Sequence, residues 1–153
     1  MHDETSAPDD LTWIRESPAY WDKAKAQIIG ASPPGTFGMD RLSKFGEGAL
    51  IPGDWWRVER DGDVLAYGWM DTTWGDAEIL LAVSPAHRNQ GVGTYVLRRL
   101  EDEARGRGFN YLYNVVSPLH PNADGVTSWL EKRRFEISDD GSLRRSLVPR
   151  RGD

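Results

Sequence analysis

Residues 83–94 read VSPAHRNQGVGT, and this stretch decides the fold. The five residues that end at Val83 are apolar without alternation, which is typical of a strand covered on both faces. After the stretch, apolar residues recur at helical spacing, at Val92, Val96, Leu100 and Ala104. The sequence therefore predicts a buried strand, a loop with two glycines and a long helix.

The loop between this strand and helix predicts an anion site. A helix N-terminus presents backbone N–H groups without intrahelical partners, and the helix dipole favours negative charge there. Gly91 and Gly93 carry no Cβ, so a phosphate or pyrophosphate can approach the backbone closely.

Three other interpretations of the glycine loop compete with this one. A dinucleotide-binding fingerprint needs a third glycine near Val96 and an acidic residue at the end of the next strand, and both are missing. A Walker loop needs a Lys-Ser or Lys-Thr pair after its second glycine, which is also missing. A glycine turn that only lets the helix and strand pack closely remains open.

Upstream of this stretch, Ser17 and Pro18 predict the N-cap and first position of a helix over 18–29, which Gly30 would end. Turn residues at Asp61-Gly62 predict a hairpin. The remaining expected strands and helices are strands at 11–15, 55–60, 64–71, 77–83, 111–116, 135–138 and 143–147, and helices at 39–45 and 124–133. The fold class is α/β (α+β), with one mixed, mostly antiparallel sheet flanked by helices on both faces.

Composition limits the classes of function. The 153 residues contain no cysteine and three histidines, so we expect no disulfide, no thiolate metal site and no metal cofactor. The net charge of −5 includes nine acidic and four basic residues in 40–78, whereas 79–109 has three acidic and five basic. Clustered basic residues are missing, so we expect no nucleic-acid partner.

The chain is expected to fold as one domain over residues 11–147, because 153 residues is the size of a single ordinary domain. Residues 1–10 are predicted to be a disordered acidic tail, and 148–153 a flexible C-terminal tail. No stretch is apolar for the length of a membrane span, and the acidic N-terminus is unlike a secretory signal. We therefore expect no membrane partner and a cytoplasmic location.

The segment Arg88-Asn89-Gln90-Gly91-Val92-Gly93 resembles the pyrophosphate arm of the GNAT superfamily of acyl-CoA-dependent N-acyltransferases. In that pattern an Arg or Gln is followed, after two residues, by a Gly and, after one more residue, by a second Gly or Ala. The expected order of strands and helices also matches the GNAT fold over nearly the whole chain. The resemblance implies that acetyl-CoA is the co-substrate.

By this resemblance, backbone amides of the loop hold the pyrophosphate. They belong to Arg88, Asn89, Gln90, Gly91, Val92, Gly93 and Thr94. The strand segment Leu81-Ala82-Val83 pairs its backbone with the pantetheine and directs an N–H at the thioester carbonyl. Family members often bulge this strand and splay it from the next, although the sequence itself shows no bulge. Asn122 lies near a position where an Asn touches pantetheine, one residue out of register.

The candidate catalytic residues are Glu78, whose position the resemblance implies, and Tyr113, a substitute for the family's acid whose alternative is a core strand tyrosine. Glu78 starts the central strand, close to where several family members place the glutamate that deprotonates the attacking ammonium; an ordinary solvated acid is the alternative. The usual tyrosine acid is missing, because Leu130 stands in its place and Arg134 replaces the glycine before the following Phe. Tyr113, His120 or water are the possible substitutes.

The acceptor is expected to be a primary amine of a small molecule or peptide, attracted as a cation by Asp54, Asp71, Asp76 and Glu78. Four tryptophans, at positions 55, 56, 69 and 74, are expected mostly in the core, with one or two lining the acceptor pocket. Gly68 marks either a bulge or a close backbone approach. The final hairpin offers an edge for a homodimer. A non-catalytic acyl-CoA sensor with the same fold is the alternative function.

Overall fold

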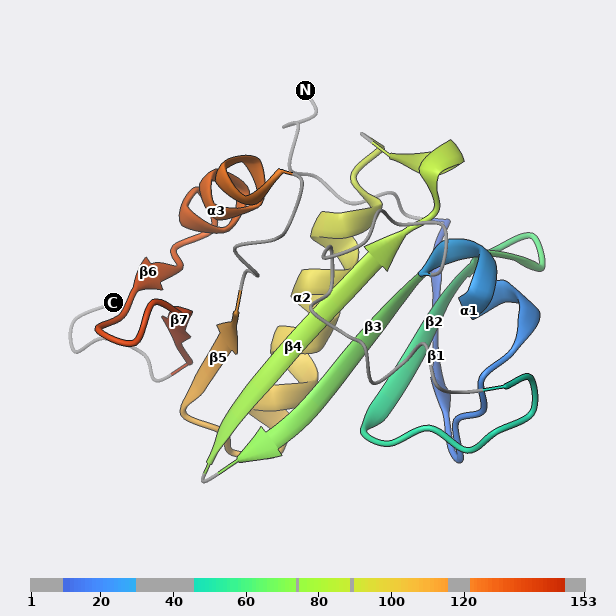
Figure 1. Ribbon diagram of the computed structural model, residues 1–153, viewed down its shortest axis with the longest axis horizontal. Helices are drawn as coiled ribbons and strands as arrows, with labels where there is room; N and C mark the ends of the chain where they lie inside the picture. The colour runs from blue at the N-terminus through green and yellow to red at the C-terminus, as the bar shows by residue number, and fades with distance from the viewer. Residues whose placement is uncertain (1–9, 30–45, 74, 89, 116–121, 148–153) are drawn as a thin grey trace.

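The computed structural model describes residues 10–29, 46–73, 75–88, 90–115 and 122–147. Within them, seven strands form one sheet in the order β1-β2-β3-β4-β5-β7-β6, and three α-helices pack around it (Figure 1). The strands are β1 (Thr12–Glu16), β2 (Asp54–Arg60), β3 (Asp63–Thr73), β4 (Asp76–Val83), β5 (Tyr111–Asn114), β6 (Glu136–Ile137) and β7 (Leu143–Ser146). The helices are α1 (Lys23–Ile28), α2 (Val92–Gly106) and α3 (Ala123–Glu131), with one 3-10 turn η1 (Pro85–His87).

The expected mixed, mostly antiparallel sheet is confirmed. All neighbouring strands pair antiparallel except β4 and β5, which are parallel and are joined through α2 as a β-α-β unit. The hairpin turn at Asp61-Gly62 and the closing hairpin of β6 and β7 also lie where the sequence predicts them. Two residues, Asp61 and Gly62, have positive φ angles of 52° and 86°, as a tight hairpin turn requires.

Two hydrophobic cores lie on opposite faces of the sheet. The larger core joins α2 and α3 to the sheet through residues such as Val96, Leu100 and Leu130. The smaller core lies under α1 and contains Trp55, Tyr67, Trp69 and Ala82. Figure 1 shows α2 and α1 on the two sides of the sheet. The prediction of helices on both faces, with β4 covered from both sides, is therefore confirmed.

Gly68 is explained by close packing rather than by a bulge. A Cβ at Gly68 would lie 2.9 Å from Trp13 and 3.0 Å from Val96, so α2 and β1 approach the backbone of β3 there. The register shift of the β2–β3 pair lies elsewhere, between Val58 and Glu59. The tryptophans at 55, 56 and 69 are buried, as expected for core residues.

The predicted helix over 18–29 is wrong at its start. Residues 19–21 are extended instead, because Trp21 N–H donates to Ala49 O at 2.7 Å and Ile51 N–H donates to Ala19 O at 3.1 Å. The N-cap is Asp22, whose side chain accepts from Lys25 N–H at 2.8 Å. Ser17 and Pro18 therefore lead into a segment that pairs with 49–51, a contact between distant residues that local sequence cannot indicate.

The strand expected at 111–116 ends earlier, at Asn114. Several other predictions fall outside the described residues: the tail at 1–9, the helix end at Gly30, the helix at 39–45, Trp74, Asn89, His120 and the tail at 148–153. Within the part of the chain that the structure describes, no helix has both the length and the apolar character of a membrane span.

Candidate active site

The central feature of the site is the separation of β4 from β5. Their parallel pairing covers only Asp76 to Glu78 of β4, opposite Tyr111 to Tyr113. β4 continues to Val83 and stays paired with β3 throughout. Among the described residues, no strand pairs with β4 beyond Glu78 on the side of β5. The far half of β4 therefore has one backbone edge without a strand partner among the described residues, and this edge, with the space beside it, is called the slot.

The hydrogen-bond pattern shows which backbone groups face this slot. Ser84 N–H donates to Leu65 O at 2.7 Å, and bonds in an antiparallel ladder recur at every second residue. Ala82 and Leu80 accordingly direct their backbone groups to β3. Leu81 and Val83 direct theirs away from β3, toward the slot. Of the three residues predicted to pair with pantetheine, two thus have the required backbone orientation.

Glu78 and Tyr113 lie side by side at the closed end of the slot, where β4 and β5 part. They are Cα partners in the last pair of the β4–β5 register, on strands about 4.8 Å apart. Side chains alternate along a strand, and Ile79 and Leu112 point into the larger core, so both Glu78 and Tyr113 project on the opposite face. Both side chains are partly exposed. The structure thus brings the two predicted catalytic residues together.

The glycine loop reaches the N-terminus of α2 beside this slot. Gly91 is the N-cap and has φ = 79°, a left-handed conformation that only glycine adopts readily. The next three residues, Val92, Gly93 and Thr94, form the first turn, whose N–H groups have no intrahelical partner. Arg88 and Gln90 are exposed in the same loop. A cluster of open amides with an adjacent cation fits a phosphate group.

Trp129 of α3 and Arg133, just after that helix, support the first turn of α2. A Cβ built on Gly93 would lie 3.5 Å from the Trp129 ring, and the Arg133 guanidinium stacks on that ring at 3.8 Å. Arg133 also donates to Thr94 Oγ1 at 3.2 Å. These contacts fix the loop relative to α3. Asn122 lies just before α3, with its side chain over Gly125 in the first turn of that helix.

The four acidic residues expected at the acceptor side fall into two groups: two form ion pairs with arginines, and two face each other across β3 and β4. Asp54 pairs with Arg107 at 2.6 Å and Arg15 at 3.3 Å, and Asp76 pairs with Arg144 at 3.2 Å. Their charges are balanced by these arginines. The other two acids of the set, Asp71 and Glu78, are Cα partners in the β3–β4 register.

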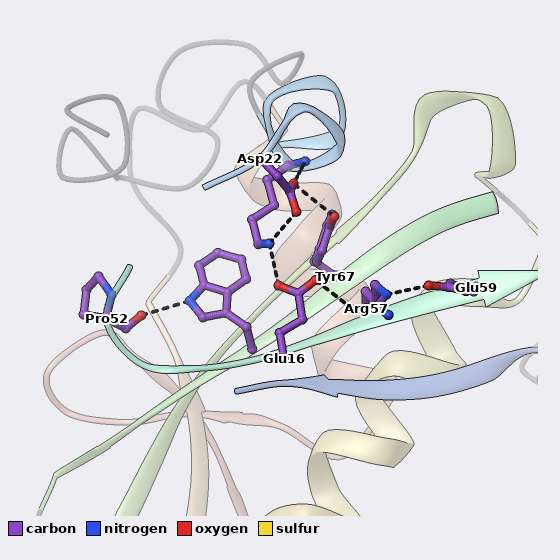
Figure 2. A network of polar contacts seen from close by, with 8 residues as sticks. Glu16, Asp22, Pro52, Arg57, Glu59 and Tyr67 are labelled. Carbon is purple, nitrogen blue, oxygen red and sulfur yellow. Dashed lines mark hydrogen bonds and ion pairs between the residues drawn. The ribbon is translucent and has the colours of Figure 1, made fainter. Parts of the chain in front are cut away.

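A buried polar network fastens α1 over the smaller core (Figure 2). Lys25 is fully buried, donates to Glu16 at 2.5 Å and to Asp22 at 3.1 Å, and lies 4.9 Å from the Tyr67 ring centre. Burial raises the pKa of the Tyr67 phenol, and the nearby carboxylates of Asp22 and Glu16 raise it further. Figure 2 shows Glu16, Asp22 and Tyr67 converging beneath α1.

Residues 13–126 match the model of the Acetyltransferase (GNAT) family, which is about three quarters of the chain. The chain belongs to the GNAT acetyltransferase family. The matched range includes the β4–β5 slot and the first turn of α2. No curated protein matches the sequence of this chain.

Solved structures show the same fold at low sequence identity. The ribosomal-protein-S18-alanine N-acetyltransferase of Escherichia coli has a TM-score of 0.62 and 19% identity, over 92% of this chain and 96% of that chain. The putative acetyltransferase yncA of Salmonella typhimurium, solved with acetyl-CoA, has a TM-score of 0.56 and 17% identity, over 93% and 96%. At these identities the likeness establishes the fold of this GNAT chain.

Sequence reasoning missed two features of this GNAT chain, one beside the glycine loop and one under α1. The stacking of Arg133 on Trp129 has a faint signal, because the two residues are four apart within the expected helix at 124–133, although α3 itself ends at Glu131. Lys25 gives no signal, since a lysine on a short helix is ordinarily exposed and its burial depends on how α1 packs on Glu16 of the preceding strand β1.

Proposed function

We propose that the protein transfers an acetyl group from acetyl-CoA to a primary amine by direct attack. The observation that carries this proposal is the separation of β4 from β5 beyond Glu78, beside the open first turn of α2. The slot suits the extended pantetheine chain, which can bond to the backbone of Leu81 and Val83. The first turn suits the pyrophosphate.

Each candidate residue has a defined task in this proposal. Only a neutral amine attacks a thioester, so Glu78 accepts the proton that the substrate ammonium must lose. As the nitrogen–carbon bond forms and the carbon–sulfur bond breaks, a backbone N–H of Leu81 or Val83 stabilises charge on the acyl oxygen. Tyr113 gives a proton to the departing thiolate and recovers one from the second proton that the nitrogen loses as it becomes an amide.

The proposed acceptor is a cationic amine of a small molecule or peptide. Asp71 and Glu78 are partners across β3 and β4, and Asp71 is exposed. Two carboxylates on one face attract a cation and suppress binding of anionic acceptors.

One observation favours a second candidate, a non-catalytic acyl-CoA sensor. Leu130 stands where the family resemblance implies a tyrosine acid, and it is buried in the larger core. That position therefore supplies no proton, and the sensor remains a candidate if Tyr113 does not act.

The test measures release of free CoA from acetyl-CoA with polyamines, aminoglycosides, amino acids and peptide N-termini. We expect release with a cationic acceptor. In Glu78→Gln, turnover should fall about 100-fold or more and lose its rise with pH, given the usual contribution of a general base. Asp71→Asn is the matched comparison: it removes the neighbouring charge but keeps the base, so it should weaken binding of the cationic acceptor while turnover still rises with pH. Binding of acetyl-CoA without release for any acceptor would establish the sensor, and no binding of CoA would refute both functions.

A further inference from the structure

One side chain lies at the point where β4 and β5 part. Asn114 is the last residue of β5, and its Nδ2 donates to the backbone carbonyl of Ile79 at 2.8 Å. Ile79 is the first β4 residue beyond the final register pair, Glu78 with Tyr113. This hydrogen bond therefore stands at the closed end of the slot.

The bond replaces a rung of the ladder. In a parallel pair, a residue accepts from the N–H one position beyond its partner on the neighbouring strand. If the register continued, Ile79 would face Asn114, and its carbonyl would accept from Val115 N–H. The side-chain amide of Asn114 takes that place, and Val115 lies outside the strand and is 55% exposed.

This exchange of a backbone donor for a side-chain donor has a physical consequence for β5. Ile79 is buried, so its carbonyl would be costly to leave without a donor. A backbone donor would hold β5 against β4 for another rung. A side-chain donor satisfies the same carbonyl and lets the main chain of β5 turn away.

We infer that Asn114 is a positioning residue that opens the β4–β5 slot for the pantetheine arm of the acyl donor. This inference rests on the proposed function of the slot. Asn114 acts through the strand backbone and not on the reacting atoms, because its amide is engaged with Ile79 O. The next β4 residue with its backbone toward the slot is Leu81, which is the first that pantetheine can pair with.

The test compares two ligands that differ only in the pantetheine arm. CoA occupies the slot and the phosphate loop, whereas adenosine 3′-phosphate 5′-diphosphate occupies only the loop. Asn114→Asp keeps the size of the side chain but replaces its donor with an acceptor, and Asn114→Ala removes the amide. We expect each variant to bind CoA about tenfold more weakly, the effect of about one hydrogen bond, with unchanged affinity for the shorter ligand.

Asn110→Asp is the matched control, because Asn110 is an exposed asparagine just before β5 and should leave both affinities unchanged. The inference is overturned if the Asn114 variants bind CoA like the wild type, if both ligands lose affinity equally, or if neither variant folds. A wild-type protein that binds neither ligand would instead refute the proposed function.

Discussion

Replacing Arg134 by glycine is expected to stabilise the protein. Arg134 follows α3 with φ = 72°, and its side chain is exposed. Its N–H donates to Glu131 O at 3.1 Å, and Phe135 N–H donates to Leu130 O at 3.1 Å. This pair of bonds is the Schellman motif that ends a helix, and its left-handed residue is usually glycine.

The magnitude follows from the backbone conformation. A left-handed conformation costs a residue with a Cβ about 1–2 kcal/mol. Glycine also makes the unfolded chain more flexible, which lowers the free energy of unfolding by about 0.4–1 kcal/mol. The net gain is about 0.8 kcal/mol, which corresponds to a rise in Tm of about 2–3 °C for a chain of this length.

The protein contains its own comparison at the end of α2. Gly108 has φ = 78°, and the same two bonds recur there, from Gly108 N–H to Arg105 O at 3.0 Å and from Phe109 N–H to Ala104 O at 3.1 Å. A Cβ at Gly108 would meet nothing within 4 Å. Gly108→Ala should therefore lower the free energy of unfolding by about as much as Arg134→Gly raises it.

The assay is thermal and urea unfolding followed by circular dichroism. Lys132→Gly is the control, because Lys132 has an ordinary helical φ of −62° and glycine there should destabilise by about 0.5–1 kcal/mol. The reasoning is refuted if Arg134→Gly melts at or below the wild-type temperature while Lys132→Gly behaves as expected.

Three further predictions concern the core. Lys25→Met should lower the free energy of unfolding in urea by about 3–5 kcal/mol, because it leaves Glu16 buried without its closest partner. Adding Glu16→Gln should recover part of that loss, and additive losses in the double variant would contradict the pairing. Gly68→Ala should destabilise by about 1–3 kcal/mol, since the new methyl group overlaps α2 and β1, and an unchanged melting temperature would show that the helix can yield. The raised pKa of Tyr67 keeps the phenol protonated in the folded state, so its contribution to stability is complete below about pH 10 and is lost as the pH rises above it. Tyr67→Phe should lose stability less steeply than the wild type above that pH in denaturation curves, and parallel curves would contradict this.

Much of the fold was predictable because its signals are local. The hairpin turn at Asp61-Gly62, the apolar run that ends at Val83 and the stripe of α2 each depend on neighbours within a few residues. The start of α1 was not predictable, because residues 19–21 pair with 49–51 instead of following the helical signal of Ser17 and Pro18.

Some features of the candidate site were likewise predictable from local sequence, and others were not. Gly91 was predictable as a loop glycine, but its left-handed φ was not, because residues at a helix N-cap are usually extended. The pairing of Glu78 with Tyr113 was not, since the register of parallel strands is set by the packing of α2 between them. Asn114 has no signal in the sequence, because its role depends on the carbonyl that happens to lie opposite.

The sequence by itself determined the type of most strands and helices, the family resemblance of the loop at 88–93 and the missing tyrosine at position 130. These depend on residue identity and short spacing, which the chain carries before it folds. Only the tertiary structure decided where β4 leaves β5, which backbone groups of Leu81 and Val83 face the slot, and which acids are balanced by arginines. Those features depend on strand register and on contacts between distant residues, and the register is fixed only when the sheet and both of its cores form together.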